Sequence, residues 1–134
     1  MKGKFSQKKK DRFLLDTNIF IWWLEQGGEK LFTEETTLIN DPSQDIYVST
    51  ITPWEITIKK QAGKIKSPSN FEEVINANNF NLLTIELTHI QELQKLPLLH
   101  KDPFDRMLIA QARVEEMTII TRDKKFTKYK VKTL

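Results

Sequence analysis

Residues 12–18 read Arg-Phe-Leu-Leu-Asp-Thr-Asn, and this short stretch sets the fold class of the whole chain. The three apolar residues from Phe13 to Leu15 are typical of a short strand that is buried within a sheet. Asp16 ends the apolar run, and residues 17–26 have the length and the apolar content of a helix. A buried strand that leads directly into a helix is the building unit of α/β proteins with parallel sheets.

The same alternation of strands and helices continues along the sequence. Further strands are predicted at 46–49, 82–85 and 118–121, with a last short one at 131–134. Helices are predicted at 33–40, 52–63, 71–78, 88–95 and 102–116. This order predicts an α/β fold in which a mostly parallel sheet is covered by helices on both faces.

Length and composition indicate one domain with a basic tail. The chain has 134 residues, the size of one ordinary domain, and no cysteine, which excludes disulfides and thiolate-held metals. The formal net charge is +3, but residues 1–12 hold six basic residues and one acidic residue, so the remainder is nearly neutral. Residues 1–11 are predicted to be a basic tail, which either attracts phosphate backbones or is a solvated terminus, and residues 12–134 to be the domain. No apolar run is suited to span a membrane or to serve as a targeting signal, so a cytoplasmic protein is expected.

Acidic residues follow the predicted strands at one edge of this sheet. Asp16 comes directly after the first strand, and Asp123 comes two residues after the strand that ends at Thr121. Glu55 lies in the first helical turn after the second strand, and Asp105 lies in the first turn of the last predicted helix. Because ligands bind at the carboxyl ends of parallel strands, these carboxylates are expected to converge.

Each of these acids also has a structural alternative. Thr52-Pro-Trp-Glu55 matches a capping box with proline at the first helical position, and Asp102 is placed to cap the helix that contains Asp105. Asp16 is placed to cap the helix that follows it, and Asp123 to start a turn. Four acids at one edge repel one another unless a cation neutralises them, and the cations that favour oxygen ligands are Mg²⁺ and Mn²⁺.

A metal site of this kind points to hydrolysis of a phosphodiester bond. Catalysis by a serine or cysteine nucleophile is not indicated, since the chain has no cysteine and neither histidine has an obvious serine partner. Two other functions stay open. One is a non-catalytic module that keeps the fold and binds RNA or protein. The other is a phosphohydrolase with Asp16 as its nucleophile, although that chemistry commonly needs a second aspartate where this chain has Asn18.

Four motifs stand in order along the chain. Residues 14–18 read Leu-Leu-Asp-Thr-Asn, and residues 49–65 contain Thr-Pro-Trp-Glu followed by Gly-Lys-Ile. Residues 100–112 begin His-Lys-Asp-Pro-Phe-Asp-Arg and are the most specific of the set, and residues 121–131 begin Thr-Arg-Asp. In order and spacing these motifs resemble those of PIN-domain nucleases, and the second resembles that of VapC-type toxins. The resemblance covers about residues 12–134.

The resemblance implies a three-layer α/β/α sandwich and a metal-dependent endoribonuclease that uses Mg²⁺ or Mn²⁺. It implies the toxin of a type II toxin–antitoxin pair, a homodimer that cuts an RNA substrate and is silenced by a cognate antitoxin protein. The catalytic residues carried over in this way are Asp16, Glu55, Asp105 and Asp123. Direct metal ligands would be Asp16, Asp105 and Asp123, whereas Glu55 would bind through water or orient the attacking water.

Several other residues lie beside these motifs. Arg106 directly follows Asp105, and Arg122 directly precedes Asp123. In these positions each arginine would hold an RNA phosphate or pair with a carboxylate. His100 precedes the third motif, where it would either touch the substrate or be a structural loop residue, and the structural interpretation is favoured. Trp22 and Trp23 are adjacent in a helix and point about 100° apart, so they cannot both face one core. Packing or docking is favoured over base stacking for this pair.

Overall fold

The computed structural model describes residues 11–25, 28–63 and 70–134, and its centre is a sheet of four parallel strands. Across the sheet the strands stand in the order β3-β2-β1-β4. Their bounds are β1 Arg12–Leu15, β2 Asp45–Ser49, β3 Asn81–Leu83 and β4 Thr118–Ile120. The register pairs Phe13 of β1 with Ile46 of β2 and Thr118 of β4, so the apolar run near the start of the sequence has a neighbour on each side. The predicted basic tail, except for Asp11, lies outside the described residues.

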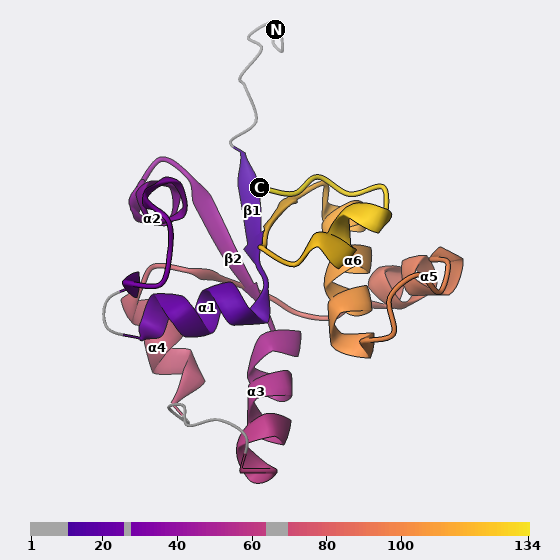
Figure 1. Ribbon diagram of the computed structural model, residues 1–134, viewed down its shortest axis with the longest axis horizontal. Helices are drawn as coiled ribbons and strands as arrows, with labels where there is room; N and C mark the ends of the chain where they lie inside the picture. The colour runs from indigo at the N-terminus through magenta and orange to yellow at the C-terminus, as the bar shows by residue number, and fades with distance from the viewer. Residues whose placement is uncertain (1–10, 26–27, 64–69) are drawn as a thin grey trace, which may run out of the picture.

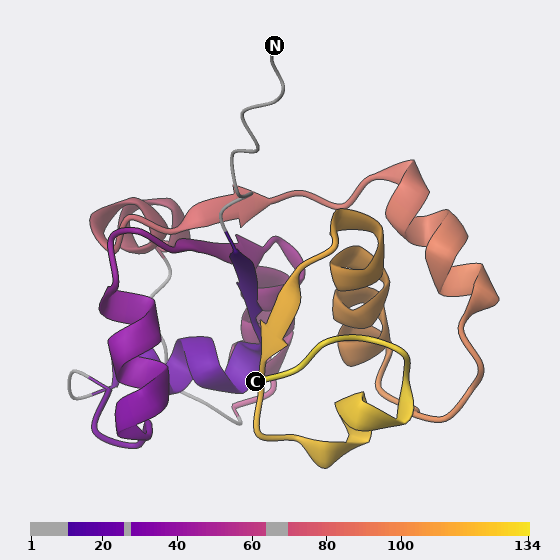
Figure 2. The ribbon, with the colours of Figure 1, turned by 90° about the horizontal axis from the view of Figure 1, so that it is seen from above.

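Helices cover both faces of this sheet. Their bounds are α1 Thr17–Leu24, α2 Thr33–Asn40, α3 Ile51–Gln61, α4 Phe71–Ala77, α5 Leu87–Lys95 and α6 Pro103–Glu115, with a 3-10 helix, η3, at Lys124–Lys128. The ribbon shows α1, α2 and α4 on one side of the strands and α5 and α6 on the other (Figure 1, Figure 2). The predicted three-layer α/β/α sandwich with a parallel central sheet is therefore confirmed.

The predicted element boundaries agree with the structure to within two residues, apart from the last strand. The segment predicted as a strand at 131–134 forms an isolated parallel bridge between Ile119 and Thr133, with backbone hydrogen bonds that join Lys132 and Leu134 to β4 and Thr121, but no full strand. In the part of the chain that the structure describes, no helix is long and apolar enough to cross a bilayer.

One apolar core lies on each face of the sheet, between the strands and the helices that cover them. Successive residues of a strand point alternately into the two cores. Phe13 and Leu15 of β1 pack into the first core, together with side chains of α1, α2 and α4. Leu14 points to the opposite face and packs into the second core with Leu108 of α6. Burial on both faces explains why the β1 run is wholly apolar up to Asp16, which is the first residue beyond the strand.

Helix α3 lies at the carboxyl edge of the sheet, where it takes part in both cores. Ile51 packs into the second core and Ile56 into the first. The helix begins at Ile51, so the predicted capping box with Thr52 as the cap is wrong. Thr52 is fully buried, and its hydroxyl lies 3.2 Å from the hydroxyl of Thr17 in α1. This tertiary contact ties α3 to α1 and places Glu55, about one turn further along, at the edge of the sheet.

Arg122 pairs with a carboxylate, but its partner is none of the four predicted site acids. Its guanidinium donates to both oxygens of Glu35 in α2, with Nη2–Oε1 and Nε–Oε2 distances of 2.6 and 3.1 Å. The same group lies over the rings of Phe32 and Trp22, 3.8 and 5.0 Å from their centroids. Arg122 therefore fastens α2 to the segment that follows β4.

Arg106 and Trp23 also have structural contacts. The Arg106 Nη2 group donates to the backbone carbonyl of Leu96 at 3.1 Å. Trp23 donates from Nε1 to Asn78 Oδ1 at 3.0 Å, and its ring lies 6.3 Å from that of Phe80. Packing and hydrogen bonding within the domain thus account for the half-buried position of Trp23.

We expect the substitution Arg122→Lys to destabilise the fold by about 1–2 kcal/mol, because a lysine cannot make the bidentate contact to Glu35 or stack as a plane on Phe32. Urea denaturation, monitored by circular dichroism, measures this decrease in the free energy of unfolding. The matched control is Arg113→Lys, which removes a single 2.8 Å contact between Arg113 Nε and Glu92 Oε2. Equal effects of the two substitutions would contradict the assigned role of Arg122.

Candidate active site

Asp16 sits where β1 and β4 end, and its side chain is held from two sides. Its backbone N–H donates to the carbonyl of Ile120 at 3.1 Å, which fixes the residue between the two strand ends. Its Oδ1 accepts from the backbone N–H of Ile19 at 2.8 Å, so Asp16 does cap α1, as the structural alternative predicted. Its Oδ2 accepts from the hydroxyl of Thr121 at 2.5 Å. Capping and membership of the acidic cluster are therefore both true of Asp16.

Thr121 links Asp16 to the next acid along the edge. The hydroxyl of Thr121, besides donating to Asp16, accepts from the backbone N–H of Asp123 at 3.0 Å. Asp123 in turn caps the 3-10 helix, because its Oδ1 accepts from the backbone N–H of Lys125 at 2.9 Å. One buried threonine thus positions two of the predicted site acids relative to each other.

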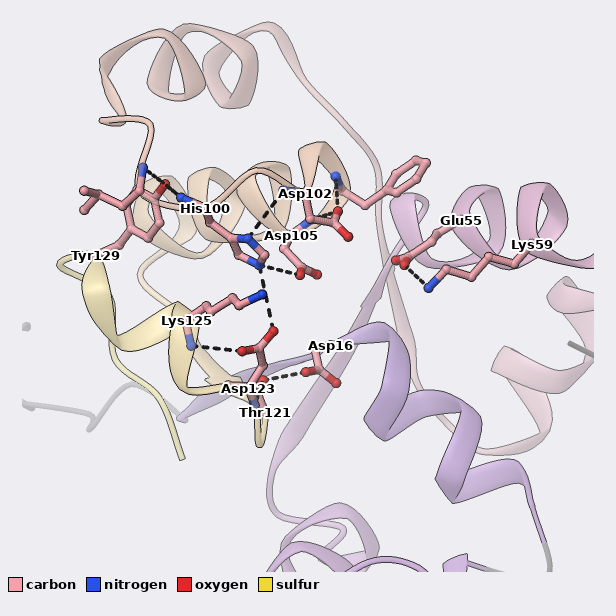
Figure 3. A network of polar contacts seen from close by, with 12 residues as sticks. Asp16, Glu55, Lys59, His100, Asp102, Asp105, Thr121, Asp123, Lys125 and Tyr129 are labelled. Atoms are coloured by element: carbon pink, nitrogen blue, oxygen red, sulfur yellow. Dashed lines mark hydrogen bonds and ion pairs between the residues drawn. The ribbon is translucent and has the colours of Figure 1, made fainter. Parts of the chain in front are cut away.

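The other two acids come from the first turns of helices. Asp105 lies in the first turn of α6, which Asp102 caps by accepting from the backbone N–H groups of Phe104 and Asp105 at 2.8 and 3.0 Å. Glu55 of α3 is almost fully buried, and its Oε2 lies 2.6 Å from Lys59 Nζ. Its second oxygen, Oε1, is buried and has no hydrogen-bond partner among the described residues. The close view shows these side chains directed toward one another from separate elements (Figure 3).

His100 belongs to this cluster, which corrects the favoured interpretation of it as a structural loop residue. Its Nε2 lies 2.8 Å from Asp105 Oδ2 and 3.8 Å from Asp123 Oδ2. Its Nδ1 faces the backbone N–H of Asp102 at 3.4 Å, an arrangement that leaves the Nε2 proton of a neutral ring to donate to Asp105. The sequence signal that could have found it is its position two residues before the helix cap, where the chain turns back toward Asp105.

A hollow of about 200 Å³ collects all four predicted acids and His100. Its remaining lining residues are Thr17, Asn18, Lys59, Asp102, Lys125 and Phe126. The hollow lies beyond the carboxyl ends of the parallel strands, where the arrangement of the fold favours a ligand site. Every one of the four acids predicted from the sequence therefore reaches the same place in the structure.

Burial and mutual repulsion change how these acids ionise. Burial raises the pKa of Asp105 to about 8, and the negative charges of Asp102 and the other three acids raise it further. Burial likewise raises the pKa of Asp16 to about 6, against the lowering effect of its hydrogen bonds from Thr121 and Ile19. Without a cation in this hollow, Asp105 therefore keeps a proton at neutral pH, where an ordinary aspartate is charged.

The arrangement fits a divalent cation. His100, Asp105 and Asp123 bring one ligand atom each to within 4.8 Å of one another, a group found by searching the described residues alone. The buried and unpartnered Oε1 of Glu55 supplies a further acceptor in the same hollow. Carboxylate oxygens are the ligands that Mg²⁺ and Mn²⁺ take in proteins. Because the Nε2 proton of His100 donates to Asp105, His100 is placed to orient a ligand of the cation.

Comparison with known proteins places this geometry in a family. The PIN domain family model matches residues 13–132, and the chain therefore belongs to the PIN-domain family. The comparison with curated proteins finds no match.

Solved structures with a similar fold come from toxin–antitoxin systems. VapBC2 from Rickettsia felis, bound to a DNA fragment from its promoter, has a TM-score of 0.71 at 16% identity, covering 92% of this chain and 97% of that one. FitAcB from Neisseria gonorrhoeae has a TM-score of 0.63 at 20% identity, covering 91% and 96%. A toxin–antitoxin complex from Klebsiella pneumoniae has a TM-score of 0.61 at 21% identity, covering 90% and 94%. At these identities the likeness establishes the fold.

We expect Asp105→Asn to stabilise the metal-free protein, with a gain that grows as the pH rises. An acid whose pKa is raised in the folded state binds more protons folded than unfolded, so the free energy of unfolding falls between about pH 4 and pH 8. Asparagine removes that loss, and a gain of roughly 3–5 °C in Tm near pH 8 corresponds to ~1 kcal/mol in a domain of this size.

Thermal unfolding in EDTA at pH 5 and pH 8 measures this difference. The control is Asp11→Asn, which removes an exposed carboxylate outside the hollow and should leave the pH dependence of Tm unchanged. A Tm of Asp105→Asn that follows the parent protein at both pH values would show that Asp105 is not under electrostatic strain.

Proposed function

We propose that this PIN-domain protein is an endoribonuclease that hydrolyses RNA phosphodiester bonds with Mg²⁺ or Mn²⁺. The observation that carries the proposal is the convergence of the four acids in one hollow, with a buried Glu55 oxygen that has no partner among the described residues. Buried carboxylates that repel one another are stable as charged groups only when a cation is added. The proposed metal ligands are Asp16, Asp105 and Asp123.

Each side chain has a distinct part in this proposal. A bound cation would polarise the phosphodiester and lower the pKa of a water molecule. Lys59 occupies Glu55 Oε2 at 2.6 Å, which leaves Oε1 as the atom to accept a hydrogen bond from the attacking water. His100 donates to Asp105 Oδ2 and so leaves Oδ1 of that carboxylate for the cation.

The geometry argues against Asp16 as a covalent nucleophile. Both of its carboxylate oxygens accept hydrogen bonds, one from the Ile19 backbone and one from the Thr121 hydroxyl. A carboxylate held in this way is stabilised and a poor nucleophile. The second aspartate that such phosphohydrolases commonly use is replaced by Asn18.

We further propose that the chain is the toxin of a type II toxin–antitoxin pair, acting in the cytoplasm as a homodimer and silenced by its antitoxin. The support is the likeness of its fold to VapBC and FitAB complexes over nine-tenths of the chain. Co-expression with the neighbouring reading frame and co-purification of the two products test this part separately from catalysis.

Asp16→Asn and Asp105→Asn should each lower RNA cleavage by more than ~100-fold while the fold is kept, since losing an outer partner of a metal ligand alone costs about 10–100-fold. The assay is cleavage of total tRNA and of ribosomal RNA in Mg²⁺ or Mn²⁺, with EDTA in parallel. Asp41→Asn is the control, because Asp41 does not line the hollow and asparagine suits its turn equally well. Full cleavage by either site variant would refute the assignment of the site.

A further inference from the structure

A second, larger groove opens beside the acidic hollow. It has a volume of about 500 Å³, and its lining residues are Leu99, His100, Lys101, Asp102, Lys125 and Lys128. Three of these, His100, Asp102 and Lys125, also line the acidic hollow, so the two depressions adjoin. The groove therefore leads from the surface to the group of carboxylates.

Three lysines of this groove are exposed. Lys101 lies in the loop before α6, whereas Lys125 and Lys128 belong to η3. None of their ammonium groups has an ion pair or a hydrogen bond within the part of the chain that the structure describes. By contrast, Lys59 on the far side of the hollow is bound to Glu55 (Figure 3). The groove thus concentrates free positive charge next to a strongly negative hollow.

The two walls that carry these lysines are fastened together by one buried tyrosine. The hydroxyl of Tyr129 accepts from the backbone N–H groups of Leu99 and His100 at 3.0 and 2.9 Å, and it donates to the carbonyl of Pro97 at 2.7 Å. Phe126 packs against the ring of His100, with their centroids 6.2 Å apart. The positions of the loop and of η3 are therefore fixed by the fold, which makes the groove a preformed surface.

A ligand for this groove must be anionic along its length and must also enter the hollow. Free anions are repelled by the four acids, whereas a phosphodiester chain can keep its flanking phosphates on the lysines while one phosphate reaches the cation. Lysine is suited to such contacts as a mobile point charge. Leu99, about half exposed, adds an apolar surface for a base or a sugar.

We propose that the groove of Lys101, Lys125 and Lys128 binds the backbone phosphates of single-stranded RNA on one side of the bond that is cut. The inference rests on the proposed nuclease function and assigns the binding of its substrate to three lysines to which the sequence analysis gave no role. The sequence analysis considered two other sites for phosphate contact, the basic tail and the two arginines. Of the arginines, Arg122 is already paired with Glu35.

The test compares two triple variants with the same change in charge, both made on Asp105→Asn so that RNA is bound without being cut. The groove variant is Lys101→Gln, Lys125→Gln and Lys128→Gln. The control variant is Lys124→Gln, Lys130→Gln and Lys132→Gln, at positions that do not line the groove. The probe is a fluorescent oligouridine of twelve nucleotides, titrated by anisotropy between 50 and 200 mM KCl.

We expect the groove variant to bind at least ~10-fold more weakly and to lower the slope of log K against log salt by about 2, since each phosphate contact on a single strand contributes about 0.7. The control variant should change the slope by much less. Equal slopes for the two variants would overturn the groove assignment.

Two further results separate this inference from the proposed function. Normal cleavage by the groove substitutions in an otherwise unaltered chain would leave the nuclease function standing and reject the groove. Loss of binding to an acidic peptide, with RNA binding unchanged, would reject RNA as the occupant in favour of a protein segment. A parent protein that neither cuts nor binds RNA, with Mn²⁺ present, would reject both proposals together.

Discussion

The mutual repulsion of buried carboxylates at the carboxyl edge of the sheet is the constraint on which the rest of the structure depends. Asp16 and Glu55 are nearly inaccessible to water, and Asp105 has a pKa near 8 because burial and neighbouring acids disfavour its charge. Left to themselves, such groups would move apart or take up water. They are held together because each belongs to an element that is fixed by one or both of the two apolar cores. Moving an acid would therefore require breaking the packing of its element.

Local hydrogen bonds offset part of this repulsion and leave carboxylate oxygens available for the proposed cation. Thr121 serves Asp16 and Asp123 together, Lys59 compensates one oxygen of Glu55, and His100 donates to Asp105. The acids remain underneutralised in the absence of a cation. This is the usual condition of a functional site, in which strain at a few residues is maintained by the stability of the surrounding fold. The exposed lysines of the neighbouring groove have no partner among the described residues, and they place positive charge where an anionic chain would approach.

Much of the fold and the acidic site could be predicted from local sequence. The apolar run before Asp16 identified the central strand, and the helix-start signals around Asp102 located both a cap and the site acid three residues later. Contacts between distant parts of the chain could not be predicted. Thr52 is buried against Thr17 instead of capping its helix, and Arg122 finds Glu35 at a separation of 87 residues. His100 enters the site because Tyr129, far along the sequence, holds its loop in place. These contacts depend on how the elements pack against one another in space, and the local periodicity of the sequence does not predict that packing.

The central claim is that the acidic hollow is a cation site, and anomalous scattering tests it most directly. Crystals grown at pH 8 and soaked in Mn²⁺ would be measured near the manganese edge, with crystals of Asp105→Asn treated identically. The account predicts an anomalous peak among Asp16, Asp105 and Asp123 that is absent or much weaker in the variant. A well-ordered hollow without a peak in the parent protein, or a peak bound elsewhere on the surface only, would contradict it.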